Sequence, residues 1–301
     1  MLVIPPALQA AGRGPDWAAW LERLPGVVRT LLEEWELTPG GEPAHGHASL
    51  VVPVVDAAGE PAMLKVGFPD WESEHEALAL QHWHGRGAVR LLRADPHRRA
   101  LLLERLHAAD LGEQWDLAAC EVVAALYGAL HRPAPPQLRP LSWYAGRVAD
   151  RLAALPHGAP LPPRFVDQAR SLARSFAADP ATDGTLVHTD LHYGNVLAAD
   201  RSDWLAIDPK PLSGDPHYEL APMLWNRFEE LSGRVRDGVR ARFHTLVDTA
   251  GLDERRARDW VVVRMLDLAG QRLEDPPGTP RELPTPHLLT MCVAIAKAVQ
   301  D

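Results

Sequence analysis

The sequence predicts an α+β protein with two lobes, a small N-terminal lobe built on an antiparallel sheet and a larger, mostly helical C-terminal lobe. Its 301 residues correspond to about two domains, at about 150 residues per domain. Short β-branched or apolar runs gather before residue 106, and nearly every long periodic stretch after it has helical spacing. We therefore expect an N-terminal lobe over residues 1–106 and a C-terminal lobe over residues 107–301.

The N-terminal lobe is predicted to run helix, strand, strand, helix, strand, strand. The first periodic stretch has apolar residues at helical spacing and is closed by Pro39-Gly40-Gly41. Two short apolar runs then flank the turn-like residues 56–60, a pattern typical of an antiparallel hairpin. The six predicted elements are residues 16–36, 48–55, 62–66, 70–83, 88–92 and 100–103.

The C-terminal lobe is predicted to be helical with one β-rich insertion. Its clearest helical stretches are separated by proline-rich links such as residues 133–136. A short β-like interlude follows, and helical spacing resumes from about residue 217 to the end. The predicted helices cover residues 116–130, 141–155 and 165–176, and the predicted strands residues 184–187, 195–198 and 204–207.

Composition excludes several classes of protein. With 31 basic against 40 acidic residues and no basic block, the chain lacks the charge that binding a phosphate backbone needs, so no nucleic-acid partner is expected. No stretch approaches the roughly 18 apolar residues of a membrane span. Cys120 and Cys292 stand alone and are interpreted as reduced core thiols. We expect a cytoplasmic protein, a monomer or a weak dimer.

The most informative motif is His188-Thr189-Asp190-Leu191-His192-Tyr193-Gly194-Asn195, with Asp208 thirteen positions after Asn195. Phosphoryl transfer needs one carboxylate to orient the nucleophile, and an amide and a second carboxylate to hold Mg²⁺ on the nucleotide phosphates. Asp190 is predicted to face the substrate hydroxyl. Asn195 and Asp208 are predicted to supply the oxygen ligands that Mg²⁺ favours.

Other interpretations of this motif stay open. Considered one by one, these residues also suit a purely structural role. His188 and Asp190 would cap a turn that Asn195 ends, and Asp208 would be a solvated strand end. His188, Asp190 and His192 alternate, and on a strand they would face one side as a zinc or iron site. That reading leaves Asn195 and Asp208 unexplained. A nucleotide-binding regulator without turnover is a further alternative, against which the intact set of polar residues argues.

Lysine is scarce in this chain, which draws attention to Lys65 on the second predicted strand. A compact ammonium there is predicted to reach the α- and β-phosphates of a nucleotide, although a strand lysine is often only an edge charge. The following helix offers carboxylates to aim it, with Glu76 best placed to face inward and Glu72 in reserve. Of the 31 basic residues, the lysines are Lys65, Lys210 and Lys297.

A nucleotide also needs cover for its phosphates and a site for its base. Residues 46–50 precede the first strand and are a candidate phosphate-covering turn with Ser49, although they lack a G-x-G-x-x-G pattern. The run that ends the small lobe is predicted to present backbone groups to adenine at Glu104, Arg105 and Leu106. The alternative for this run is an ordinary strand end.

These motifs, with residues 205–211 and 214–216, resemble the protein-kinase-like phosphotransferases and, within them, the aminoglycoside/hydroxyurea antibiotic resistance kinase family. The resemblance implies a protein-kinase-like bilobal fold. It also implies transfer of the γ-phosphoryl group of ATP, or of GTP, to a small-molecule hydroxyl in the presence of Mg²⁺. The expected acceptor is an aminoglycoside such as streptomycin, with hydroxyurea or another metabolite as the alternative. By the same resemblance, Asp190 is catalytic, Asn195 and Asp208 bind Mg²⁺, Lys65 and Glu76 aim the phosphates, and residues 104–106 form the adenine hinge.

The chain departs from the family pattern at one position. Glu219 stands where many relatives carry aspartate, which leaves its scaffold role open. Lys210, directly beyond Asp208-Pro209, is interpreted as a surface charge rather than a phosphate contact. Cationic acceptors would be held by carboxylates on the C-terminal helices, although such carboxylates are often only solvated. The candidates are Asp267, Glu274 and Asp275.

Overall fold

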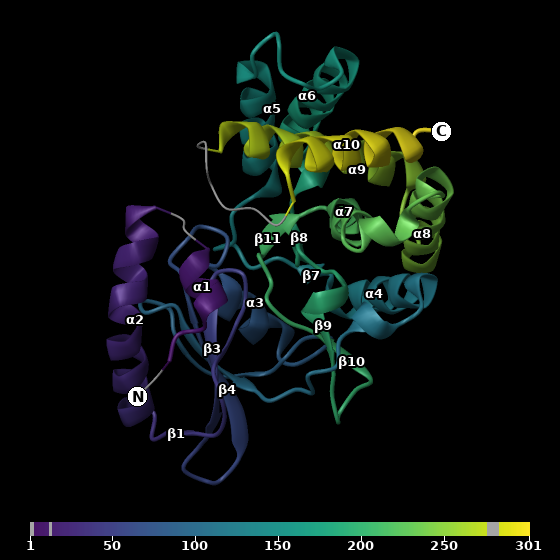
Figure 1. Ribbon diagram of the computed structural model, residues 1–301. Helices are drawn as coiled ribbons and strands as arrows, with labels where there is room; N and C mark the ends of the chain where they lie inside the picture. Colours follow the sequence, from purple (N-terminus) through teal and green to yellow (C-terminus); the bar gives the residue numbers. More distant parts are fainter. Residues whose placement is uncertain (1–2, 12–13, 276–282) are drawn as a thin grey trace. The chain divides into compact units, whose positions relative to one another are not determined.

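The computed structural model describes residues 3–11, 14–275 and 283–301 and divides them into two units. The first unit ends at His107 and the second begins at Ala108, one residue beyond the boundary that the sequence predicts. Figure 1 labels most of the helices and strands of the two units. None of the helices among the described residues is both long and apolar enough to cross a membrane.

The first unit is built on a six-stranded antiparallel sheet. The strand order is β1-β3-β4-β6-β5, and β2 pairs with β3. Lys65 of β4 lies opposite Val51 of β3 on one side and Leu101 of β6 on the other, so it sits inside the sheet rather than on an edge strand. The elements are α1 Pro6–Ala10, α2 Pro15–Glu34, β1 Thr38–Pro39, β2 Ala44–His45, β3 Ser49–Val55, β4 Pro61–Gly67, α3 Glu76–Trp83, β5 Leu91–Asp95 and β6 Ala100–Glu104.

Helix α2 covers one face of this sheet (Figure 1). Successive side chains of a strand point to opposite faces, and in β4 Leu64 and Val66 are buried in the same cluster as Trp17 and Leu24 of α2. Lys65 lies between them in the sequence and therefore points to the other face. The same alternation that builds the apolar core thus presents the lysine away from it.

Helix α3 is shorter than the sequence predicts. It begins at Glu76, whereas helical spacing begins at residue 70. The Asp70 carboxylate accepts a hydrogen bond from the Ser73 backbone N–H at 2.8 Å, and the Ser73 hydroxyl donates to the Phe68 carbonyl at 3.1 Å. These side chains take over backbone partners that a helix would need, so the segment before Glu76 forms turns.

Strand β5 also differs, because it begins at Leu91 rather than residue 88 and continues to Asp95. The Asp95 carboxylate accepts from the Arg98 backbone N–H at 3.1 Å and from the Arg98 guanidinium at 2.6 Å. Arg99 has a positive φ of 52°. The turn into β6 is thereby formed at residues 96–99, later in the chain than predicted.

The second unit contains seven α-helices and two small antiparallel sheets among its described residues. Strands β9 and β10 form a hairpin, and β8 lies between β7 and β11. Helices α5, α6 and α9 pack together, and α10 packs on α9 and α8. The elements are α4 Asp116–Leu130, β7 Arg132–Pro133, α5 Leu141–Ala154, α6 Pro163–Ala178, β8 Thr185–Val187, β9 Val196–Ala198, β10 Trp204–Ala206, β11 Leu212–Gly214, α7 Ala221–Trp225, α8 Val235–Ala250, α9 Glu254–Glu274 and α10 Thr285–Ala298.

A buried carboxylate anchors the segment that follows β11 to the helices. Asp215 is 1% exposed and accepts hydrogen bonds from the Trp260 indole at 2.7 Å and from the Arg256 guanidinium. It also accepts from the His217 ring at 2.6 Å. Trp260 in turn stacks on Phe176 with ring centroids 3.8 Å apart. Helices α6 and α9 are thereby tied to the chain just beyond the candidate site.

The central strand of the first unit gives a test of the core. Leu64→Ala removes a side chain that is 0% exposed in β4, and we expect it to lower the free energy of unfolding by about 2–5 kcal/mol, because the cavity cannot fully collapse. Leu92→Ala, in β5 of the same sheet but 52% exposed, should change it by about 0.5 kcal/mol at most. Urea unfolding followed by tryptophan fluorescence measures both. Equal losses in the two variants would contradict this placement of β4.

Candidate active site

The candidate active site of the second unit lies on the loop between β8 and β9 and on the chain that returns after β10. The Ile207 backbone N–H donates to the Asn195 carbonyl at 2.9 Å, and the Lys210 N–H donates to the His188 carbonyl at 3.0 Å. The His188 ring Nε2 lies 2.9 Å from the Ile207 carbonyl and donates to it. These bonds hold the returning segment, which carries Asp208, beside the loop.

Asn195 is placed to offer an oxygen to a cation. Its side-chain Nδ2 donates to the Asp190 carbonyl at 2.9 Å, and the side chain is largely buried. Because the amide nitrogen is occupied there, the Oδ1 oxygen is the atom left to face a metal. Asp208 adds a carboxylate from the adjoining segment, and its φ of 56° lies in the left-handed region. An amide oxygen and a carboxylate suit Mg²⁺, so the donors present fit the predicted ion.

Thr189 is held in a strained backbone conformation directly before Asp190. Its φ is 65°, which is unusual for a β-branched residue and costs about 1–3 kcal/mol. The Thr189 hydroxyl donates to the Lys210 carbonyl at 2.7 Å, and its N–H donates to the Glu219 carboxylate at 3.1 Å. These two bonds maintain the strained turn that presents Asp190.

The Glu219 carboxylate holds the backbone of this turn. Its side chain is 0% exposed, and its carboxylate accepts hydrogen bonds from the backbone N–H groups of both His188 and Thr189. Burial raises the pKa of the Glu219 carboxyl, but the neighbouring His131 ring and the His188 N–H stabilise the anion more strongly, so its pKa lies below the ordinary value. The position therefore serves as the scaffold of the loop although it carries glutamate instead of aspartate.

Asp190 makes an ion pair that its sequence motif does not predict. Its Oδ2 lies 2.9 Å from the Lys210 Nζ, and the two side chains are 19% and 34% exposed. Burial raises the pKa of the Asp190 carboxyl, but the Lys210 ammonium and the His192 and His188 rings together outweigh burial and lower the pKa below the ordinary value. The interpretation of Lys210 as a surface charge is therefore wrong, since its ammonium and the Asp190 carboxylate are in contact.

The structure contradicts the alternative of a zinc or iron site. Both ring nitrogens of His188 are already used, because Nε2 donates to Ile207 and Nδ1 accepts from the Asp190 N–H at 3.3 Å. The His192 Nδ1 accepts from the Gly194 N–H at 3.2 Å. Across the part of the chain that the structure describes, no group of three or more His, Cys, Asp or Glu residues is arranged to hold a metal ion.

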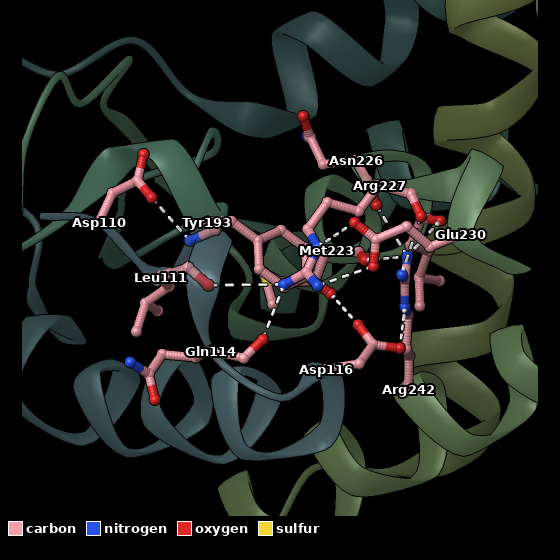
Figure 2. Close-up of polar contacts among 12 residues, drawn as sticks. Asp110, Leu111, Gln114, Asp116, Tyr193, Met223, Asn226, Arg227, Glu230 and Arg242 are labelled. Carbon is pink, nitrogen blue, oxygen red and sulfur yellow. Dashed lines mark hydrogen bonds and ion pairs between the residues drawn. The ribbon is translucent and has the colours of Figure 1, made fainter.

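A polar network holds the second half of the loop through Tyr193 (Figure 2). The Tyr193 hydroxyl donates to Asp116 at 2.6 Å, and the Arg242 Nε, fully buried, donates to the same carboxylate at 2.9 Å. The Arg227 guanidinium lies 4.7 Å from the centroid of the Tyr193 ring and pairs with Glu230 at 2.7 Å. Helices α4 and α8 thereby fix the residue that lies between Asp190 and Asn195.

The first unit brings Lys65 and Glu76 together, as the sequence predicts. The Lys65 Nζ lies 2.6 Å from the Glu76 Oε1, and their side chains are 9% and 7% exposed. Glu76 is the first residue of α3, so the late start of this helix places its carboxylate beside β4. A buried ion pair of this geometry fixes the direction of the ammonium.

The other residues predicted to contact nucleotide also lie in the first unit. Ser49 begins β3 and is 5% exposed, and the Gly46 N–H donates to its carbonyl at 2.9 Å across a tight turn. Glu104 ends β6, and its carboxylate accepts from the Arg90 N–H at 2.7 Å. Residues 105–106 follow without regular secondary structure. Their roles toward a nucleotide stay predictions.

The three carboxylates predicted for the acceptor lie at helix α9. Asp267 is buried and accepts from the Tyr144 hydroxyl at 2.7 Å and from the Arg151 guanidinium. Glu274 is 52% exposed and lies 3.0 Å from the Arg151 Nε. Asp275 lies 3.5 Å from the Arg272 Nε. Each carboxylate therefore already has an arginine partner, and their role toward an acceptor stays a prediction.

The comparisons with known proteins agree in one family. The profile of the family described as aminoglycoside/hydroxyurea antibiotic resistance kinase matches residues 34–275. The chain is 40% identical over 276 residues to a streptomycin 6-kinase of Streptomyces glaucescens, covering 89% of each protein. It is 43% identical over 277 residues to a hydroxyurea phosphotransferase of Kitasatospora aureofaciens, covering 88% of this chain and 76% of that protein.

Solved structures share the fold at low sequence identity. An amicoumacin kinase matches with a TM-score of 0.60 and 13% identity, over 93% of this chain and 95% of that one. An aminoglycoside phosphotransferase from Alicyclobacillus acidocaldarius matches with a TM-score of 0.55 and 11% identity, over 90% and 92% of the two chains. The predicted α+β, protein-kinase-like fold is therefore confirmed.

The Glu219 hydrogen bonds give a pH-dependent test. Since the folded-state pKa lies below the unfolded value of about 4.5, the Glu219 carboxylate stabilises the fold above pH 4.5, and its contribution is lost as the pH falls through the folded pKa. We expect Glu219→Gln to cost about 3 kcal/mol at pH 7, with a smaller difference from the unaltered protein at pH 3. Urea unfolding at the two pH values measures this.

The matched control is Glu229→Gln, since Glu229 is exposed and lies on the same stretch of chain. It should change the free energy of unfolding by about 0.5 kcal/mol at most. A penalty for Glu219→Gln that stays the same at pH 7 and pH 3 would show that the charge of this carboxylate does not hold the loop.

Proposed function

Because the chain belongs to the aminoglycoside/hydroxyurea antibiotic resistance kinase family and is a small-molecule phosphotransferase, we propose that it moves the γ-phosphoryl group of ATP to a hydroxyl of an aminoglycoside. Streptomycin is the first acceptor to test. The observation that carries the proposal is the local geometry of the loop, where Asp190 is presented by a strained turn while Asn195 and the segment of Asp208 are tied together.

Asp190 would orient the acceptor hydroxyl and accept its proton as the bond to phosphorus forms. The transition state of such a transfer is loose, with charge spread over the equatorial oxygens, so positioning and charge stabilisation matter more than a strong base. A carboxylate with a lowered pKa is suited to this task, because it stays an acceptor of hydrogen bonds at neutral pH. Its orientation would come from the turn at Thr189.

Asn195 and Asp208 would hold Mg²⁺ through the Asn195 Oδ1 and the Asp208 carboxylate. Bound there, the ion would neutralise charge on the nucleotide phosphates. The task of these two side chains is to keep the triphosphate in one orientation. Their hydrogen-bonded backbone supports that task, since Ile207, next to Asp208, donates directly to the Asn195 carbonyl.

The first unit would bind the nucleotide. We assign the Lys65 ammonium, aimed by Glu76, to the α- and β-phosphates, Ser49 to the phosphate-covering turn, and residues 104–106 to the adenine. GTP is the alternative donor. We further propose that the protein works as a monomer or weak dimer in the cytoplasm, where ATP is made and where its two buried thiols stay reduced.

The acceptor could also be hydroxyurea, since a relative with 43% identity is a hydroxyurea phosphotransferase. The net charge of −9 favours a cationic acceptor such as streptomycin over a neutral one. Of the three candidate carboxylates, Glu274 is the most open to such a ligand, with a side chain 52% exposed, compared with 7% for Asp267 and 26% for Asp275.

Mass spectrometry of an acceptor panel tests the proposed function. The protein is incubated with ATP and Mg²⁺ and with streptomycin, other aminoglycosides, hydroxyurea or a set of hydroxylated metabolites. We expect one added phosphate on streptomycin. Phosphate on hydroxyurea alone would select the alternative acceptor, and no product with any compound would contradict the assignment of a kinase of this class.

Two substitutions separate the proposed roles in the loop. Asp190→Asn should lower turnover about 100-fold or more while nucleotide affinity is kept, because the carboxylate acts on the acceptor. Asp208→Ala should abolish the dependence of nucleotide affinity on Mg²⁺. Steady-state kinetics and nucleotide titration calorimetry with and without Mg²⁺ measure these effects.

The control is Asp203→Ala, which removes an exposed carboxylate near Asp208 in the sequence. It should leave turnover and nucleotide affinity unchanged. Similar mild losses for Asp190→Asn and Asp208→Ala would contradict the division of roles.

A further inference from the structure

We propose that Lys210 is a catalytic residue whose ammonium contacts the transferred phosphoryl group while it also holds Asp190. The inference rests on the proposed phosphotransfer and adds a residue to its machinery. The observation behind it is the 2.9 Å contact between the Lys210 Nζ and the Asp190 Oδ2. This ion pair belongs wholly to the second unit.

The Lys210 ammonium lies close to where the acceptor hydroxyl and the phosphorus are expected. An acceptor hydroxyl oriented by Asp190 lies about 2.6–3.2 Å from its carboxylate, and the phosphorus that it attacks lies about 3–3.5 Å farther on. An ammonium already at 2.9 Å from the same carboxylate needs only a rotation of its flexible stem to reach the phosphoryl oxygens. The Lys210 side chain is 34% exposed, which leaves room for that rotation.

The backbone of Lys210 is held by hydrogen bonds while its side chain reaches the Asp190 carboxylate. The Lys210 N–H donates to the His188 carbonyl at 3.0 Å, and its own carbonyl accepts from the Thr189 hydroxyl at 2.7 Å. Pro209 and Pro211 flank it and restrict the backbone on both sides. The side chain that carries the ammonium therefore starts from a fixed backbone next to the turn that presents Asp190.

The loop itself supplies no permanently cationic side chain beside the proposed Mg²⁺ ligands. Residues 188–195 contain no lysine or arginine, although negative charge gathers on the transferred group beside Asp190. Lys210 brings that positive charge from the returning segment. Removal of one preorganised donor that faces developing transition-state charge costs about 100- to 1000-fold in kcat in other enzymes. Lysine at this position, in a chain whose basic residues are otherwise nearly all arginine, supplies a compact ammonium on a flexible stem.

The chain offers a direct chemical test, because its three lysines are Lys65, Lys210 and Lys297. The probe is ATP whose γ-phosphate is joined to a carboxylic acid as a mixed anhydride. A lysine amine beside the γ end attacks the acyl carbon, an amide forms, ATP leaves and the amine proton passes to solvent. Peptide mass spectrometry then reports which lysines carry the acyl group.

We expect acylation of Lys210 that excess ATP suppresses, with Lys65 labelled as a report of nucleotide binding and the exposed Lys297 as background. Labelling of Lys65 without Lys210 would overturn the inference and leave the proposed function standing. Labelling of neither, or of all three alike, would overturn both the inference and the proposed nucleotide site.

Variants separate contact with the phosphoryl group from a purely orienting role. Lys210→Met should lower kcat about 100-fold with the KM for ATP changed less than about 3-fold, and Lys210→Arg should recover part of the loss. Lys297→Met, which removes the same charge on α10, should have no effect. If Lys210 only oriented Asp190, its loss would cost nothing more in an Asp190→Asn background, so we expect Lys210→Met to lower the residual rate of that variant further. Additional loss below about 3-fold would contradict the contact.

Discussion

The hydrogen bonds from the His188 and Thr189 backbone to the buried Glu219 carboxylate are the interaction on which the rest of the site depends. A carboxylate with no exposed surface is costly unless its oxygens are satisfied, and here the two N–H groups satisfy them. The carboxylate also holds Thr189 in a backbone conformation that the branched side chain of threonine disfavours. Asp190 then projects from a turn that has one arrangement. Every role proposed for the loop starts from that orientation.

Polar networks rather than apolar packing position the chemistry of the second unit. Asp215 ties the chain after β11 to Arg256 and Trp260, and Asp116 ties Tyr193 to Arg242. Each network joins a short irregular segment to a long helix. Such segments have too few apolar side chains to be fixed by burial, so hydrogen bonds to charged groups provide the precision instead. We infer that sites of this kind keep costly buried charges because orientation depends on them.

The sequence predicts the helices and motifs that neighbouring residues form. It does not predict contacts that form when a distant segment of the chain folds back. Long periodic helices such as α4 are identified closely, whereas β11 is too short to show a period. Asp190, Asn195 and Asp208 can be found because their spacing is itself a signal. Asp116 and Arg242 are 126 residues apart, and no spacing connects them. The scarcity of lysine draws attention to Lys65, whereas Lys210 is misinterpreted as a surface charge, because its contact with Asp190 depends on how the segment after β10 folds back.

The proposed function requires that the loop between β8 and β9 and the segment after β10 together bind a triphosphate and its metal ion. A crystal structure with Mg²⁺ and a non-hydrolysable ATP analogue tests it most directly. We expect the ion on the Asn195 Oδ1 and the Asp208 carboxylate, with Asp190 left to face the acceptor. An ion bound instead by Asp190 or His192, or a triphosphate bound away from this loop, would contradict it.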